Sequence, residues 1–204
     1  MSFTGIFKAK DGLVAIADSK ATIKSDGKFI EDVGRNPEKL FPFVNGVAVI
    51  YGANQILVQN QARLFSQKTN VEDLIYEYLN GKHTLDSNFF QGLLLKMSSN
   101  PANQEPIHFI VGHRIWEGKY RIEHHQIGYN YYLQRLIPDN ENYFTGGEEL
   151  YKLAFNQMDS LSRITSVDIL QKYAAEKLEE LIAFYDKTLA YNPVGGIVKS
   201  YILR

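Results

Sequence analysis

Cysteine, net charge and long apolar runs are all scarce in this 204-residue chain. The absence of cysteine excludes disulfides, thiolate zinc sites and cysteine nucleophiles. The 22 basic and 23 acidic residues leave a net charge of −1, so no basic face is predicted and nucleic acid is not an expected partner. The longest apolar stretches, such as Val47–Tyr51, are far too short to span a bilayer, so no membrane association is expected.

The sequence predicts one cytoplasmic domain. Its start, MSFTGIFKAKDG, has no cationic leader followed by an apolar segment, so a signal peptide is not expected. Hydrophobic residues make up 45% of the chain, which is enough for one sizeable core. No linker-like stretch, repeat or low-complexity segment divides it. We therefore predict a single domain over residues 1–204.

Short strands dominate the first quarter of the chain. Asp11-Gly12 is a strong hairpin signal between two β-rich stretches, Phe3–Ala9 and Leu13–Ala17. Further strands are predicted at Phe29–Val33, Leu40–Phe43 and Val47–Tyr51, the last as a continuous apolar run.

The pattern then turns helical. Gln55–Ser66 has spaced apolar residues and neither glycine nor proline, which predicts a helix, and a second, interrupted helix is predicted over 71–79 and 89–97. The remaining predicted elements are strands at 107–112, 120–127 and 142–144, helices at 148–156 and 166–189, and a last strand at 196–203. Runs of strands that alternate with runs of helices favour an α+β fold with antiparallel sheets over a parallel doubly wound sheet.

One segment carries a family resemblance. Residues 12–22 read GLVAIADSKAT, which resembles the start of a proteasome β-type subunit: a glycine, an apolar strand and then Ala-Asp-Ser-(Arg/Lys)-Ala-Thr. Looser matches at Lys39, Thr145-Gly146-Gly147 and Gly195-Gly196 extend the resemblance over essentially the whole chain. It implies the N-terminal-nucleophile (Ntn) hydrolase fold of a bacterial-type proteasome homologue, a four-layer αββα sandwich with two antiparallel sheets between helical layers.

The resemblance also implies five site residues. The family's nucleophile lies sixteen residues before its aspartate, and because that aspartate matches Asp18, the nucleophile matches Ser2. Serine replaces the family's usual threonine and becomes terminal only if Met1 is removed. Lys39 matches the family's lysine, with Lys28 as the alternative. The backbone N–H of Gly52 is the implied oxyanion donor, and Thr145 stands where the family has a serine.

These residue types fit acyl transfer. An α-amine has a pKa of about 7.7–8.0, so part of it is neutral near pH 7 and can accept the Ser2 hydroxyl proton. A nearby Lys39 ammonium would lower that pKa by like-charge repulsion, and Asp18 would hold Lys39 as an ion pair. The Gly52 N–H would stabilise the tetrahedral oxyanion, and Thr145 could hydrogen-bond the amine. The predicted function is hydrolysis of peptide or related amide bonds through an acyl-enzyme, without a cofactor.

Two other functions stay open at this point: a non-catalytic, ring-forming relative similar to α-type subunits, and a small-molecule amidase on the same fold. The first is favoured by serine in place of threonine, by Met1 and by residues 191–194. Just before the last glycine pair, the family often has an Asp and a Ser that support the nucleophile, and residues 191–194 contain neither. Either these supporting contacts are altered in this chain, or Asp186 provides them from a longer loop. The resemblance further implies a homo-oligomer, as a ring or stacked rings, while an ATPase partner stays unknown.

Four histidines are the other chemistry-bearing residues: His108, His113, His124 and His125. They alternate along predicted strands and therefore face different sides, and no carboxylate lies at ligand spacing. We expect surface or core histidines rather than a metal site.

Overall fold

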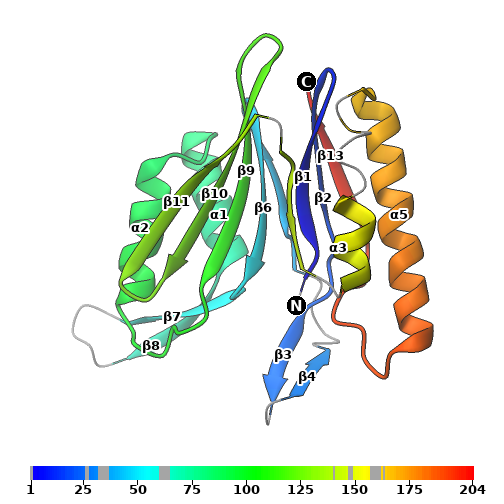
Figure 1. Cartoon of the computed structure of the whole chain (residues 1–204). Coiled ribbons are helices and arrows are strands. Elements are labelled where there is room, and N and C mark those ends of the chain that lie inside the picture. Colours follow the sequence, from blue (N-terminus) through cyan, green and yellow to red (C-terminus); the bar gives the residue numbers. More distant parts are fainter. Residues whose placement is uncertain are drawn as a thin grey trace.

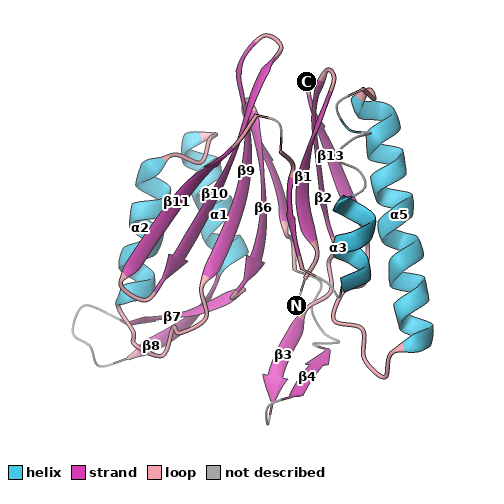
Figure 2. Cartoon of the chain, in the orientation of Figure 1, coloured by secondary structure: helices cyan, strands magenta, loops and turns pink. Residues whose placement is uncertain are grey.

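Two antiparallel sheets form the centre of the fold, with helices on their outer sides (Figures 1 and 2). The computed structural model describes residues 2–25, 28–31, 37–59, 65–139, 141–146, 149–156, 162 and 164–204. Within these residues the protein is α+β, as predicted from the order of its elements.

The first sheet has four strands in the order β12-β1-β2-β13. They are β1 (Thr4–Ala9), β2 (Gly12–Ala17), β12 (Tyr143–Thr145) and β13 (Lys199–Leu203). Ala9 pairs with Gly12, so the predicted hairpin is confirmed. The Asp11 carboxylate in its turn accepts a 2.8 Å hydrogen bond from the N–H of Val167, which ties the hairpin tip to the start of a helix. The last strand begins at Lys199, later than predicted.

The second sheet has five strands in the order β11-β10-β9-β6-β5. They are β5 (Leu40–Phe43), β6 (Gly46–Gly52), β9 (Ile107–Trp116), β10 (Lys119–Gly128) and β11 (Tyr131–Ile137). The sequence did not predict β11. Leu133 and Leu136 in this edge strand are exposed and only Ile137 is fully buried, so the strand lacks the alternating apolar face that marks the others.

The predicted helix Gln55–Ser66 is wrong. Residues 55–59 form β7 (Gln55–Gln59), which pairs with β8 (Ser66–Asn70) in a two-stranded sheet, and residues 60–64 lie outside the described residues. The β-branched Ile56 and Val58 favour a strand, and Ile56 is buried in the same apolar cluster as α2 side chains. A second small sheet pairs β3 (Thr22–Ser25) with β4 (Lys28–Glu31).

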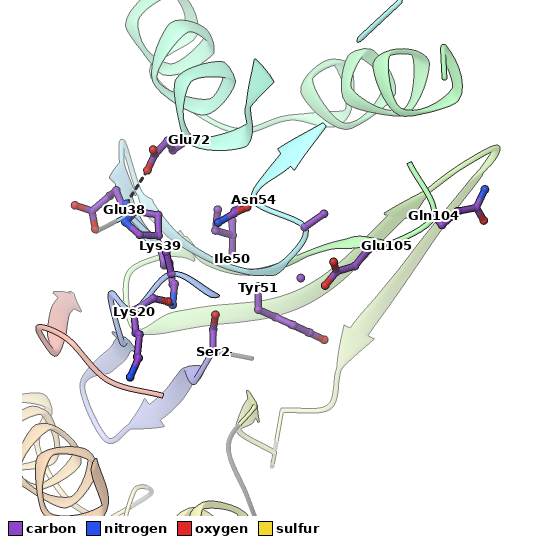
Figure 3. Close-up of a pocket in the computed structure, with 14 residues that line it drawn as sticks. Ser2, Lys20, Glu38, Lys39, Ile50, Tyr51, Asn54, Glu72, Gln104 and Glu105 are labelled. Atoms are coloured by element: carbon purple, nitrogen blue, oxygen red, sulfur yellow. Dashed lines mark hydrogen bonds between the residues drawn. The ribbon is translucent and has the colours of Figure 1, made fainter. Parts of the chain in front are cut away.

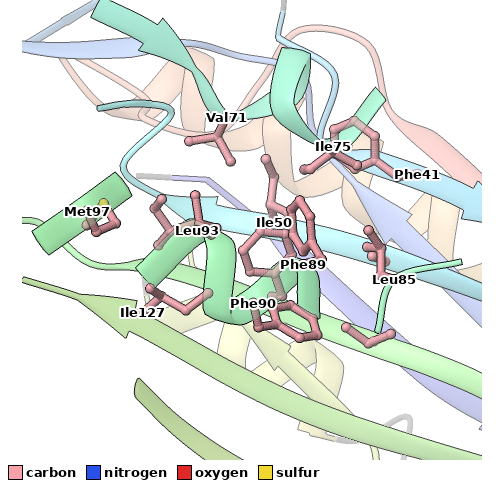
Figure 4. Packing of buried hydrophobic residues seen from close by; sticks show 14 of the residues in the cluster. Phe41, Ile50, Val71, Ile75, Leu85, Phe89, Phe90, Leu93, Met97 and Ile127 are labelled. Atoms are coloured by element: carbon pink, nitrogen blue, oxygen red, sulfur yellow. The ribbon is translucent and has the colours of Figure 1, made fainter. Parts of the chain in front are cut away.

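The helices cover the outer faces of the two main sheets. They are α1 (Val71–Lys82), α2 (Ser87–Ser98), α3 (Glu149–Asn156) and α5 (Val167–Thr188). Side chains of α1 and α2 share a buried cluster with the five-stranded sheet (Figure 4), and those of α3 and α5 share one with the four-stranded sheet. The predicted interruption of the second helix is the boundary between α1 and α2. His83 ends α1 in a left-handed conformation, and the Asp86 carboxylate caps the start of α2.

A third cluster joins the inner faces of the two sheets. Ile6 and Leu13 of the four-stranded sheet contact the same cluster as Val47, Val49 and Ile110 of the five-stranded sheet. Because the sheets pack in this way, residues at the start of β1 can lie close to residues at the ends of β2, β6 and β12. No helix among the described residues is both long and apolar enough to cross a bilayer.

The inter-sheet cluster gives a test of the packing. Ile110 is completely buried there, so Ile110→Ala removes apolar contacts and leaves a cavity, with an expected loss of about 2–5 kcal/mol in the free energy of unfolding. Urea denaturation measures this. Leu133→Ala on the exposed edge strand is the control and is expected to change stability by less than about 0.5 kcal/mol. Equal effects of the two changes would contradict the assigned sheet packing.

Candidate active site

A buried ion pair lies at the end of β2. The Lys39 ammonium donates a 2.8 Å hydrogen bond to Asp18 Oδ1, and the two side chains are 6% and 0% exposed. Asp18 directly follows β2, and Lys39 directly precedes β5 in the other sheet. The ion pair therefore links the two sheets at this end of the molecule.

Backbone N–H groups satisfy the rest of the Asp18 carboxylate. Oδ1 also accepts from the N–H of Phe3 at 2.9 Å, and Oδ2 accepts from those of Gly195 at 3.0 Å and Lys20 at 3.3 Å. The N–H of Asp18 donates in turn to the Phe3 carbonyl at 3.0 Å. Such donors favour the ionised carboxylate and fix its orientation.

Lys39 is held on two sides. Besides Asp18, its ammonium donates to the Lys20 carbonyl oxygen at 2.7 Å, so two of its three N–H donors have acceptors among the described residues. Burial lowers the pKa of Lys39 from its ordinary value, and the neighbouring Asp18 charge raises it in part. The alternative lysine, Lys28, lies instead in β4 of the separate two-stranded sheet.

Ser2 lies two residues before β1 and lines the same pocket as Lys39. Its backbone carbonyl packs against Gly146, where a Cβ would lie 1.5 Å from the carbonyl oxygen, and Gly146 has φ +97°. Residue 146 must therefore be glycine for Ser2 to occupy this place. Met1, whose removal the prediction requires, lies outside the described residues.

Ser2, Lys39 and Gly52 border one pocket of about 480 Å³, and the Ser2 hydroxyl points into it (Figure 3). Gly52 ends β6 with φ +90°, and a Cβ there would lie 2.2 Å from the Pro106 carbonyl oxygen. Lys20, Tyr51 and Asn54 also line the pocket, together with the carboxylates of Glu38, Glu72 and Glu105. Four of the five predicted residues are thus brought together, three on the pocket wall and Asp18 behind Lys39.

Thr145, the fifth predicted residue, is at the edge of this group. It ends β12 and pairs with Thr4 of β1, and it is outside the described lining of the pocket. Its side chain contacts Tyr51, whose pKa is raised mainly by burial and lowered in part by the hydrogen bond with Thr145.

Sequence reasoning missed the contributions of Lys20 and Gly195. The Lys20 carbonyl holds the Lys39 ammonium, and the Gly195 N–H holds Asp18. Backbone groups leave no residue-type signal, although the Gly195-Gly196 match marked the second position. Asp186, the suggested supporting acid, lies in α5 and accepts a 3.0 Å hydrogen bond from Asn192 Nδ2.

Two of the histidines come together on the inter-sheet face. His108 Nδ1 lies 3.0 Å from His124 Nε2, and Tyr51 and Tyr143 hydroxyls lie 3.3 Å from the two ring nitrogens of His124. Burial lowers the pKa of each of the two histidines to about 4. In the described part of the chain, no three His, Cys, Asp or Glu residues group as metal ligands.

Comparison with known proteins gives matches in structure alone. No protein-family model matches the chain, and no curated protein does. Among solved structures, Anbu (ancestral beta-subunit) from Yersinia bercovieri matches with a TM-score of 0.55 and 12% identity, over 98% of this chain and 80% of that chain. Anbu from Hyphomicrobium sp. strain MC1 matches with a TM-score of 0.50 and 18% identity, over 98% of this chain and 81% of that one. At these identities the likeness shows the fold: the chain folds like Anbu.

The fit of Gly146 around Ser2 is testable. Gly146→Ala places a Cβ on the Ser2 carbonyl, so the start of β1 must shift, whereas Gly118→Ala at a similarly left-handed turn, φ +71°, meets no atom within 4 Å. The control bears only the left-handed strain of about 1–2 kcal/mol. Gly146→Ala is expected to lose clearly more free energy of unfolding in urea denaturation, and equal losses would contradict the close approach.

The histidine pair predicts a pH dependence of stability. Both pKa values lie near 4 in the folded protein and near 6.5 in the unfolded chain, so the unfolded state binds more protons between these values. The stabilising effect of the neutral pair is complete above about pH 6.5 and is lost as the pH falls toward 4. Urea midpoints should therefore fall less steeply over this range in the His108→Gln/His124→Gln variant than in the wild type.

Proposed function

We propose that this chain hydrolyses peptide or related amide bonds, with Ser2 as the nucleophile after removal of Met1. The observation that carries the proposal is the buried Asp18–Lys39 pair, whose lysine borders the same pocket as the Ser2 hydroxyl. A buried ion pair contributes little net stability, because desolvation offsets the attraction. A catalytic role therefore explains better than a contribution to stability why the pair lies on the wall of a pocket that the Ser2 hydroxyl also borders.

In the proposed first step, the free α-amine of Ser2 takes the proton from its own hydroxyl while the oxygen attacks the substrate carbonyl. Lys39 uses two of its donors on Asp18 and Lys20, and its third N–H is the donor that stabilises the developing charge on Ser2 in this proposal. Burial lowers the pKa of Lys39 from its ordinary value, and shifted pKa values of this kind cluster at functional sites.

The tetrahedral intermediate then collapses. Its oxyanion is bound by the backbone N–H of Gly52, whose close approach to the Pro106 carbonyl requires glycine. The C–N bond breaks, the Ser2 ammonium gives its proton to the leaving amine, and an ester remains on Ser2. Water, deprotonated by the same amine, hydrolyses this ester and regenerates the hydroxyl. No cofactor takes part.

The fold and assembly belong to the same proposal. The inner cluster between the sheets and the helices on their outer faces support the four-layer αββα sandwich of Ntn hydrolases, as a single domain. The resemblance of residues 12–22 supports a proteasome-type homo-oligomer in the cytoplasm, and Anbu from Yersinia bercovieri is itself described as a beta-subunit. The role of Thr145 is to orient Tyr51 at the pocket edge.

The test compares Ser2→Ala with Ser2→Thr on protein whose intact mass shows that Met1 is absent. Ser2→Ala removes the nucleophile and is expected to lower kcat on a fluorogenic peptide panel by at least about a thousandfold. Ser2→Thr keeps a hydroxyl and an α-amine, so turnover is expected to persist.

The panel also separates the alternatives. Turnover of non-peptide amides alone would support the small-molecule amidase instead. No turnover by protein with a free Ser2 amine would exclude both hydrolases and leave the non-catalytic, ring-forming role.

A further inference from the structure

A short segment between α5 and β13 reaches the ion pair. Gly195 donates its N–H to Asp18 Oδ2 at 3.0 Å, and its carbonyl accepts from the N–H groups of Ser19 and Lys20 at 3.2 and 2.9 Å. The next residue, Gly196, has φ +73°, and a Cβ there would lie 2.6 Å from Ser19 Oγ. Gly195 therefore fits closely against the backbone that carries Asp18.

The side chain of Asn192 determines the course of this segment. It is 3% exposed, and its Oδ1 accepts from the Val194 N–H at 3.1 Å, which closes a turn two residues long. Its Nδ2 donates to Asp186 Oδ1 at 3.0 Å and to the Ile182 carbonyl at 3.3 Å, both in the last turns of α5. Asn192 thus connects the end of α5 to the residue that precedes Gly195.

The Gly195 N–H matters because Asp18 Oδ2 has few other donors. Its second donor is the Lys20 N–H, at the longer distance of 3.3 Å. A carboxylate that is buried and loses a donor becomes harder to ionise and less firmly oriented. Any shift of the 192–195 turn would therefore act on Asp18, and through Asp18 on Lys39.

We propose that Asn192 is a positioning residue, which places the Gly195 N–H on Asp18 and so keeps the Asp18 carboxylate aimed at Lys39. Its effect on catalysis rests on the function proposed above, while its effect on Lys39 does not. Asp186 acts in this arrangement as the hydrogen-bond acceptor that holds Asn192. It is exposed on α5, so it supports the site through the geometry of Asn192 and not through its own charge.

The experiment exchanges the two partners. Asn192→Asp removes the donor and sets two carboxylates against each other, which should displace the turn. The double variant Asn192→Asp/Asp186→Asn restores one donor and one acceptor in swapped positions, so it should return the turn to its place. This rescue separates a positioning role from general damage to the fold, which the swap would not repair.

Two readouts are measured in the wild type and both variants. NMR titration of the Lys39 side chain should show a lower pKa in Asn192→Asp, because Lys39 loses part of the raising effect of Asp18, and a return toward the wild-type value in the double variant. Peptide hydrolysis should show kcat reduced roughly 10- to 100-fold with KM little changed, since Asn192 is away from the described pocket lining, and should recover in the swap.

The outcomes for Asn192 and for the proposed function are distinguishable. An unchanged Lys39 titration in Asn192→Asp, or a changed one that the swap fails to restore, overturns the positioning role even if Ser2→Ala abolishes turnover. If no variant hydrolyses anything, the function fails, and the Lys39 titration alone decides the role of Asn192. Should Asn192→Asp not fold, a folded double variant with wild-type Lys39 titration supports the proposal, and an unfolded one overturns it.

Discussion

The ion pair between Asp18 and Lys39 is the constraint on which the arrangement of this end of the molecule depends. A carboxylate with no exposed side-chain surface must have donors on both oxygens, because an unpaired buried charge costs several kcal/mol. The donors come from the residue before β1, from the residues after β2, from the residue before β5 and from the segment before β13. The Asp18 side chain thereby holds four separate parts of the chain in fixed positions relative to one another.

Glycines complete this arrangement, because the backbones approach too closely for a side chain. Gly146 makes room for the Ser2 carbonyl, Gly52 for the Pro106 carbonyl and Gly196 for the Ser19 hydroxyl, each at a positive φ. Charge attraction at Asp18 and close backbone contact at these glycines act on the same region. The result is a closely packed frame around one pocket, which suits the proposed attack of Ser2 on a substrate carbonyl.

The sequence predicted the parts of this frame that depend on residue type and local pattern. Asp11-Gly12 marked the first hairpin, and the resemblance of residues 12–22 to proteasome β-type subunits pointed to Asp18. It failed where tertiary contacts decide. The apolar pattern of residues 55–59 is ambiguous, and they form a strand whose Ile56 packs in the same buried cluster as side chains of α2. The leucines of β11 are exposed, so its side chains gave no strand pattern and only its backbone pairing shows that it belongs to the sheet. The support of Asp18 by Gly195 was equally invisible, since a backbone N–H belongs to every residue except proline.

The same contacts bear on the position of Ser2. Phe3 is fully buried, and its N–H and carbonyl both bond to Asp18, so the residue that follows Ser2 is held at both of its backbone polar groups. Gly146 encloses the Ser2 carbonyl from a third direction. Contacts of the Ser2 carbonyl and of the residue that follows therefore help to set the position of Ser2. In the proposed mechanism, removal of Met1 turns the Ser2 nitrogen from an amide, which cannot accept a proton, into an amine that can act as the base.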